Sequence, residues 1–230
     1  MSILETRDLY FTYPDGDERK VILNNVNVSF DKGMFYTILG ESGSGKTTFL
    51  SLISALDKPE SGEILFNGES IKKIGYEKYR RNDIGIVFQS FNLIPYMNGV
   101  ENVMVAMSIT ENKMDKDIKK NALEILESVG IDGNKAMRRI NRLSGGEQQR
   151  VAIARAISTN VDIIIADEPT GNLDSKTSDT IIELFKELAH VRNKCVIMVT
   201  HAQKVADASD IILKLNTDTQ NFEVIHNEMV

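Results

Sequence analysis

The segment FYTILGESGSGKTTFLSLISAL, residues 35–56, decides the fold of this 230-residue chain. It opens with a short apolar run, Phe35–Leu39, which is typical of a strand buried on both faces. A glycine-rich loop follows at Gly40–Thr48, and the pattern of Thr47–Leu56 predicts a helix directly after it. This order of strand, loop and helix predicts an α/β protein with a binding site at the loop.

The loop contains the pattern GxxxxGKT, which is typical of a phosphate-binding loop. Glycines leave a concavity into which backbone amides point, and the helix N-terminus favours an anion. We expect Lys46 to pair with the β- and γ-phosphates, the Thr47 hydroxyl to bind Mg²⁺, and Thr48 to add a hydrogen bond. A chance match is expected in about one chain in a hundred of this length. The predicted phosphate site comprises Gly40, Glu41, Ser42, Gly43, Ser44, Gly45, Lys46, Thr47 and Thr48.

A second apolar run, IIIADEPT at residues 163–170, ends in two acids. Ligands bind at the carboxyl ends of strands in open α/β sheets, and a buried unpaired acid is costly to a fold. We therefore expect Asp167 to organise the Mg²⁺ shell and Glu168 to polarise the attacking water, as a general base or a water-positioning group. The alternative is a helix-capping pair at the turn before Pro169.

Three further residues are weaker candidates. His201 directly follows the apolar run CVIMVT, where it is placed to contact a γ-phosphate, although a lone histidine is usually structural. Gln89 ends the predicted strand Ile84–Phe88, where its amide can touch Mg²⁺ and water or be simply solvated. Tyr13 lies in the polar turn FTYPDG, where its ring can stack on adenine or serve only as a surface aromatic.

The string LSGGEQQR at residues 143–150 places Ser144, Gly145 and Gly146 before a predicted helix, Glu147–Ser158. Two glycines at a helix start allow a backbone to approach closely, and the helix N-terminus favours an anion. Ser144 with Glu147 also fits an ordinary capping box, and both roles can hold together. One nucleotide site does not need two helix N-termini about 100 residues apart, so the second implies a second chain.

The remaining patterns predict how the chain is organised. The first part is rich in predicted strands, whereas residues 91–141 have a helical pattern that we interpret as an insertion between two halves of the core. Strands and helices alternate after it, which predicts a mostly parallel sheet. The predicted strands and helices outside the opening segment are Ile3–Phe11, Val21–Phe30, Glu63–Phe66, Ile84–Phe88, Asp115–Val129, Glu147–Ser158, Asp162–Ala166, Ser175–His190, Cys195–Thr200, Ile211–Leu215 and Phe222–His226.

Composition limits the possible partners. The hydrophobic fraction of 42% is sufficient for one substantial core, and the net charge of −6 argues against a nucleic-acid partner. The single cysteine, Cys195, excludes an internal disulfide and fits a reducing compartment. No apolar run approaches the ~18 residues that span a bilayer, so we expect any link to a membrane to go through a partner.

The ordered set of motifs resembles the ATP-binding cassette (ABC) ATPases, over about residues 3–213. The resemblance implies a P-loop NTPase core with a mostly parallel sheet, an N-terminal antiparallel β subdomain and a helical subdomain inserted at about residues 91–158, all in one domain of residues 1–230. In that family two cassettes face head to tail, and Ser-Gly-Gly of one closes over the ATP held by the other. The resemblance also implies that Tyr13 stacks on adenine, that Gln89 contacts Mg²⁺ and water, that Asp174 lies at the seam and that His201 contacts the γ-phosphate.

The same resemblance implies ATP and Mg²⁺ as cofactors and a second ATPase subunit, most simply in a homodimer. Two membrane permease subunits are implied as partners, contacted near Phe91–Met97, although these apolar side chains also suit the core of the helical subdomain. The implied location is cytoplasmic, on the inner face of the cell membrane.

Within the family, LDKPESGEI at 56–64 and PTGNLDS at 169–175 resemble the group that powers lipoprotein release, macrolide or peptide export, and cell-division signalling. Ile140 and Met34 replace a proline and a glutamate that are common there. The predicted function is an ATPase that drives export or extraction. The alternatives are a regulatory ATPase that signals across the membrane without cargo and, on weaker grounds, a DNA-repair type of ABC ATPase, against which the acidic composition and the short insertion argue.

Overall fold

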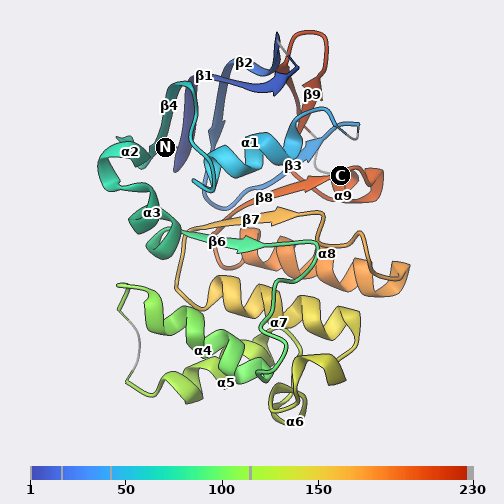
Figure 1. Cartoon of the computed structure of the whole chain (residues 1–230). Coiled ribbons are helices and arrows are strands. Elements are labelled where there is room, and N and C mark those ends of the chain that lie inside the picture. The colour runs from blue at the N-terminus through green and yellow to red at the C-terminus, as the bar shows by residue number, and fades with distance from the viewer. Residues whose placement is uncertain (1, 17, 42, 114–115, 227–230) are drawn as a thin grey trace.

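A computed structural model describes residues 2–16, 18–41, 43–113 and 116–226. Figure 1 shows an antiparallel sheet at one end of the molecule, a larger sheet across its middle, and a group of helices at the other end. The larger sheet has the strand order β10-β9-β3-β8-β7-β6, and the smaller has the order β2-β1-β4-β5. This is the predicted architecture of a mostly parallel core with an N-terminal antiparallel sheet.

The central strands of the larger sheet are buried on both faces. In β8 (Cys195–Thr200), Val196 and Met198 face one hydrophobic core, whereas Ile197 and Val199 face the other. The β3 strand (Phe35–Leu39) pairs with β8 in parallel, and β7 (Ile163–Asp167) and β6 (Ile84–Val87) continue the parallel order. On the other side of β3 lie β9 (Ile211–Asn216), in parallel, and β10 (Asn221–His226), which is antiparallel to β9.

Helices cover both faces of this sheet. The α1 helix (Lys46–Ile53) buries Phe49 and Leu50 in the core that it shares with the antiparallel sheet. The α8 helix (Ser175–His190) carries Ile181, Leu184, Phe185 and Leu188 on one face, as its sequence period predicts, and buries them in the other core. Because both helices follow strand ends, their N-termini lie at the carboxyl edge of the sheet.

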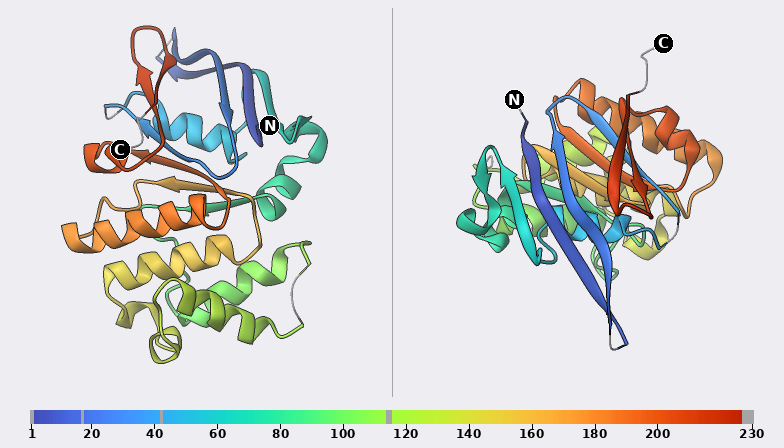
Figure 2. Two further views of the ribbon diagram at one scale, coloured as in Figure 1. Left: turned by 180° about the vertical axis from the view of Figure 1, so that it is seen from behind. Right: turned by 90° about the horizontal axis from the view of Figure 1, so that it is seen from above.

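The antiparallel sheet is longer than its apolar pattern predicts. The β1 strand (Leu4–Asp15) pairs with β2 (Glu18–Phe30) through Pro14↔Arg19 and Asp15↔Glu18, so the strands continue into the polar turn. The hairpin they form extends beyond the rest of the molecule in the view from above (Figure 2). The β4 strand (Ser61–Phe66) pairs with β1, and β5 (Glu69–Ser70) lies at the edge.

Helices fill the segment between β6 and β7. These are α4 (Gly99–Ile109), α5 (Ile118–Ser128), α6 (Gly133–Ala136), a short 3-10 turn (Ile140–Arg142) and α7 (Gly145–Ile157). Side chains cap four of them, among which Asn98 and Ser144 form capping boxes. Residues 91–98 are not helical, because Phe91 and Asn92 adopt φ of 61° and 49° and Pro95 interrupts the helical pattern.

Two short helices, α2 (Ile71–Ile74) and α3 (Tyr76–Asn82), were not predicted, and α9 (Gln203–Asp207) follows β8. Each of α2 and α3 is shorter than two full helical turns, so its sequence shows little helical periodicity. None of the helices within the described ranges is both long and apolar enough to cross a bilayer.

Candidate active site

The loop between β3 and α1 can hold its shape only with glycine. Gly43 and Gly45 adopt φ of 78° and 105°, which side chains rarely allow. A Cβ atom on Gly45 would also lie 2.6 Å from Ile22 Cγ2 of β2, so the hairpin of the antiparallel sheet touches this loop. Ser42, predicted as part of the phosphate site, lies outside the described residues.

Lys46 is the first residue of α1 and is buried under the loop. Its Nζ donates hydrogen bonds to the carbonyl oxygens of Gly40, at 2.8 Å, and Glu41, at 2.7 Å. Burial lowers the pKa of Lys46, whereas the negative charges of Glu168 and Asp167 raise it. The phosphate loop and the acids at the end of β7 therefore form one electrostatic site.

The buried face of the loop carries an unsatisfied hydroxyl. Ser44 Oγ is buried and has no hydrogen-bond partner among the described residues, and Thr48 is also buried, whereas Thr47 is exposed. A buried hydroxyl without a partner costs free energy unless a ligand satisfies it. The cradle of glycines with this hydroxyl and the Lys46 ammonium therefore fits the phosphates of a nucleotide.

The two acids at the end of β7 have different surroundings. Burial is the main cause that raises the pKa of Asp167, the neighbouring Glu168 raises it further, and Lys46 opposes both. Glu168 adopts a left-handed φ of 44°, and its backbone N–H donates to the Val199 carbonyl at 2.9 Å. Its carboxylate meets the Nδ1 atom of His201 at 2.7–2.8 Å. The structure thus brings together two of the three predicted catalytic residues.

The third predicted catalytic residue, Gln89, lies near the same glycine as this acid. A Cβ atom added to Gly171 would lie 2.9 Å from Gln89 Nε2 and 3.5 Å from Glu168 Oε2. The amide of Gln89 and the carboxylate of Glu168 therefore both lie close to Gly171, where any side chain would crowd them. Sequence reasoning assigned no packing role to Gly171, because the need for space there arises only from the fold.

Tyr13 is placed on β1 near the tip of the hairpin. Its side chain is exposed and its ring packs edge-on against Phe11, with the ring centroids 5.0 Å apart. Ile22, on the paired strand, reaches the phosphate loop. The hairpin therefore carries an exposed aromatic ring nearer its tip than the point where it contacts the phosphate loop.

The predicted capping role of Ser144 is observed at the start of α7. Ser144 Oγ accepts from Glu147 N at 3.3 Å, and Glu147 Oε2 accepts from Ser144 N at 2.9 Å. The Ser144 amide is the main cause that lowers the pKa of the Glu147 carboxyl. This capping box fixes the backbone of the Ser-Gly-Gly motif without using all the N–H groups of the helix N-terminus.

The second glycine of this motif has a structural role that sequence reasoning missed. A Cβ atom on Gly146 would lie 2.4 Å from Thr177 Cγ2 in the first turn of α8. Thr177 is held there because its N–H and hydroxyl donate to Asp174 at 3.0 and 2.6 Å. Asp174, predicted for the seam between two chains, is therefore also the N-cap of α8.

Replacing Gly146 with Ala is expected to destabilise the chain by about 1–3 kcal/mol, because overpacking forces Thr177 out of its hydrogen bonds with Asp174. Urea unfolding without nucleotide measures this loss. Gly145→Ala is the matched control, because its added Cβ would lie 3.6 Å from Leu173 Cδ2, which is ordinary contact. Equal stability of the two variants would contradict the packing role of Gly146.

All these motifs lie on one side of the molecule. Figures 1 and 2 show the loop before α1, the connection between β7 and α8, and the start of α7 along the same edge. The phosphate loop and the Ser144 motif lie at the two ends of this edge, with the β7–α8 connection between them. The two helix N-termini therefore do not converge on one nucleotide within one chain.

The strand β3, its glycine loop, the buried Lys46 and the acids of β7 define a P-loop nucleotide hydrolase. The chain belongs to the ATP-binding cassette family, since the family model described as ABC transporter matches residues 23–171. It is an ATP hydrolase of this family.

Related proteins match the sequence of this chain along almost its whole length. The Bacillus subtilis ABC transporter ATP-binding protein YclH is 47% identical over 216 residues, which cover 94% of each chain. The macrolide export ATP-binding/permease protein MacB of Syntrophobacter fumaroxidans is 37% identical over 219 residues, 94% of this chain and 30% of that one.

A solved structure of the cassette MJ0796, which is dimeric, matches with a TM-score of 0.87 and 38% identity, over 99% of this chain and 100% of that one. A post-hydrolysis dimer of the same cassette, bound to ADP and Pi, matches equally well. These likenesses agree with a chain that binds ATP or ADP.

Proposed function

We propose that this chain is the ATPase subunit of an ABC transporter, that two copies close head to tail on ATP, and that closure drives membrane permease partners. The observation that carries the proposal is the separation of the phosphate loop from the Ser144 motif along one edge of the chain. In a pair related by a two-fold axis, the phosphate loop of each chain can lie opposite the Ser144 motif of the other. The dimeric MJ0796 structures support the association of two copies.

The nucleotide site takes ATP with Mg²⁺. The hydroxyl of Thr47, the amide oxygen of Gln89 and the carboxylate of Asp167 would hold Mg²⁺, because they are the oxygen ligands that this ion prefers. Among the described residues no group of three or more His, Cys, Asp or Glu side chains could hold a metal by itself. This fits a metal that arrives with the nucleotide. When bound there, Mg²⁺ would supply positive charge that offsets the charge of the phosphates.

Glu168 accepts a proton from the attacking water or orients that water. His201 holds the Glu168 carboxylate through Nδ1 and leaves its own Nε2 free for the γ-phosphate. The amide of Gln89 lies close to the same glycine, Gly171, as this carboxylate. Tyr13 stacks on adenine, and Ser144, Gly145, Gly146 and Asp174 act at the nucleotide of the partner chain.

Replacing Asp167 with Asn is expected to stabilise the chain without nucleotide while weakening its response to Mg²⁺. Because burial raises the pKa of Asp167, its ionised form destabilises the fold above that pKa, and the penalty disappears as pH falls through it. Unfolding at pH 7.5 should show a gain on the order of 0.5 kcal/mol, which shrinks in acid. In a titration with Mg²⁺, the ATPase activity of Asp167→Asn should be lower than that of the unchanged protein. A less stable variant at pH 7.5 would contradict this account.

The permease partner contacts the segment Phe91–Met97 and its surroundings, next to Gln89. The chain then lies on the cytoplasmic face of the membrane through this partner. The similarity to the macrolide export protein supports a role in export or in extraction of a lipoprotein, peptide or drug.

Cysteine cross-linking tests the head-to-tail arrangement. The sole cysteine, Cys195, is buried, so added surface cysteines react alone. Chains with Glu41→Cys are mixed with chains carrying Ser144→Cys, both with Glu168→Gln to slow hydrolysis. We expect an ATP-dependent cross-link in the mixture and in neither variant alone.

Val191 lies at the C-terminal end of α8 and is 77% exposed, so Val191→Cys in place of Glu41→Cys is the control. Cross-links that form equally with the control or without ATP would refute the arrangement.

A further inference from the structure

Gln89 lies in a tight turn whose two ends are held differently. Residues 88–91 form this turn, and the Phe91 N–H closes it by donating to the Phe88 carbonyl at 3.1 Å. The first end of the turn directly follows β6, which is paired with β7 in the sheet. The second end lies outside the sheet, so the position of the Gln89 amide depends on what holds Phe91.

The backbone at the second end of the turn is strained. Phe91 and Asn92 adopt left-handed φ of 61° and 49°, one directly after the other. A bulky side chain rarely adopts this conformation, whereas asparagine tolerates it better. Such residues keep their conformation only where neighbouring groups hold them. The turn therefore needs an anchor at Phe91 and Asn92.

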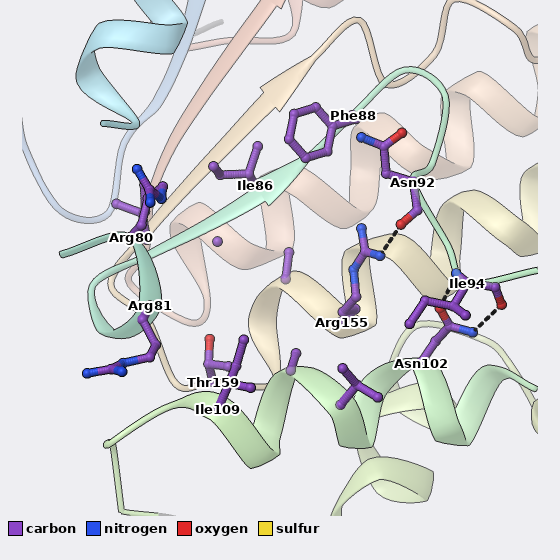
Figure 3. Close-up of a pocket in the computed structure, with 15 residues that line it drawn as sticks. Arg80, Arg81, Ile86, Phe88, Asn92, Ile94, Asn102, Ile109, Arg155 and Thr159 are labelled. Atoms are coloured by element: carbon purple, nitrogen blue, oxygen red, sulfur yellow. Dashed lines mark hydrogen bonds between the residues drawn. The ribbon is translucent and has the colours of Figure 1, made fainter. Parts of the chain in front are cut away.

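Arg155, in the last turn of α7, supplies this anchor. Its Nη2 donates to the Phe91 carbonyl at 3.0 Å, and its Nη1 donates to the Asn92 carbonyl. Figure 3 shows the side chain reaching from α7 to Asn92 in a cavity of about 350 Å³. Within the described part of the chain it forms no ion pair with a carboxylate, and burial lowers its pKa. The guanidinium therefore serves the two carbonyls and not an acid.

A second contact joins the same turn to the start of α7. A Cβ atom added to Gly145 would lie 4.0 Å from Phe91 Cζ, so the Phe91 ring reaches the first residue of this helix. The Phe91 carbonyl is held by Arg155 near the other end of the helix. Because both contacts are made with one continuous helix, they hold the end of the turn against a single rigid element.

We infer that Arg155 is a positioning residue for ATP hydrolysis, because it holds the turn that keeps the Gln89 amide beside Gly171. The Glu168 carboxylate lies close to the same glycine, so the turn sets where the amide stands relative to the proposed base. The inference rests on the proposed role of Gln89 and adds the side chain on which that role depends. A guanidinium suits this task because its planar fork of N–H donors can bond two neighbouring carbonyls at once. Arg155 lies outside the predicted phosphate site, and we expect it to affect hydrolysis only through Gln89.

A double-mutant cycle between Arg155 and Gln89 tests the inference with the full chain. Arg155→Met keeps the apolar stem and removes the donors, so it should lower kcat about tenfold while the KM for ATP changes by less than about twofold. Gln89→Ala should lower kcat by a similar factor. Where Gln89→Ala is already present, Arg155→Met should lower kcat by less than about twofold, because the amide that Arg155 positions is gone.

Hydrogen exchange without nucleotide gives a readout that does not depend on activity. In Arg155→Met the peptide of residues 88–93 should exchange about fivefold faster or more, because the turn opens once its anchor is lost. The peptide of the phosphate loop should exchange at its normal rate. Arg192→Met is the matched control, because Arg192 pairs with Glu187 away from the turn, and it should change neither kcat nor exchange.

Arg155→Lys keeps the charge but lacks the planar fork, so its kcat should lie between those of Arg155→Met and the unchanged protein. If Arg155→Met does not fold, the same cycle is measured with Arg155→Lys. Normal kcat in the folded variant, equal losses with and without Gln89→Ala, or a loss confined to ATP affinity overturns the inference alone. Normal kcat in Gln89→Ala refutes the proposed role of Gln89, and the inference with it.

Discussion

Glu168→Gln is expected to leave ATP binding intact and to slow hydrolysis by about 10²–10⁴-fold. The Glu168 carboxylate meets His201 Nδ1 at 2.7–2.8 Å, and the Gln89 amide lies close to the same glycine, Gly171, as this carboxylate. An amide keeps nearly the same shape and can still accept a hydrogen bond from His201, but it cannot take a proton from water. The variant therefore removes proton transfer while it preserves the site.

Slow hydrolysis should then trap the closed dimer. Light scattering coupled to size-exclusion chromatography, with ATP and Mg²⁺, should show a dimer for Glu168→Gln and mostly monomer without nucleotide. Glu183→Gln makes the same chemical change on the exposed face of α8 and should hydrolyse ATP normally. If Glu168→Gln remains monomeric with saturating ATP, the shared-site model fails. If it hydrolyses ATP at the normal rate, the assignment of the base fails.

The elements that the sequence predicts best are buried on both faces or strongly periodic. The observed β3, β8 and α8 have the predicted bounds, because a short apolar run or a 3.6-residue period dominates each. Helices α2 and α3 were missed, because each is too short for a period to emerge. The segment 91–98 was predicted as part of a helical region, but left-handed backbone at Phe91 and Asn92, whose carbonyls accept hydrogen bonds from Arg155, overrides that pattern.

The features of the candidate site also divide into those that a local sequence pattern predicts and those that depend on the fold. Motifs that are contiguous in sequence, such as the glycine loop and the pair Asp167–Glu168, could be predicted because their residues act together locally. The hydrogen bond between Glu168 and His201 was not predicted, although both residues were, because it depends on how β7 and β8 align in the sheet. The contact of Gly146 with Thr177 joins two helix N-termini, and no local pattern reports such a contact.

Lys46→Ala is expected to reduce ATP affinity by at least about 100-fold, since hydrogen bonds from a charged group to phosphate contribute about 1.5–3 kcal/mol each. Without nucleotide, Lys46 Nζ donates to the carbonyls of Gly40 and Glu41, so it is buried beneath the loop before ATP arrives. Binding requires only that this ammonium exchange carbonyl partners for phosphate oxygens. Burial already lowers the pKa of Lys46, so the empty loop stabilises the lysine charge incompletely. The negative charge of the bound phosphates compensates for this.

Fluorescent ATP titration measures this loss, and two variants separate charge from loop structure. Lys46→Met keeps the apolar stem and should bind ATP as weakly as Lys46→Ala, whereas Lys204→Ala removes a surface ion pair with Asp179 and should bind normally. Combined with Glu168→Gln, Lys46→Ala should also abolish the ATP-dependent dimer, because a chain without bound ATP gives the Ser144 motif of its partner nothing to close over. Tight ATP binding by Lys46→Met would refute the role of the lysine charge, and with it the electrostatic link between the loop and the acids of β7.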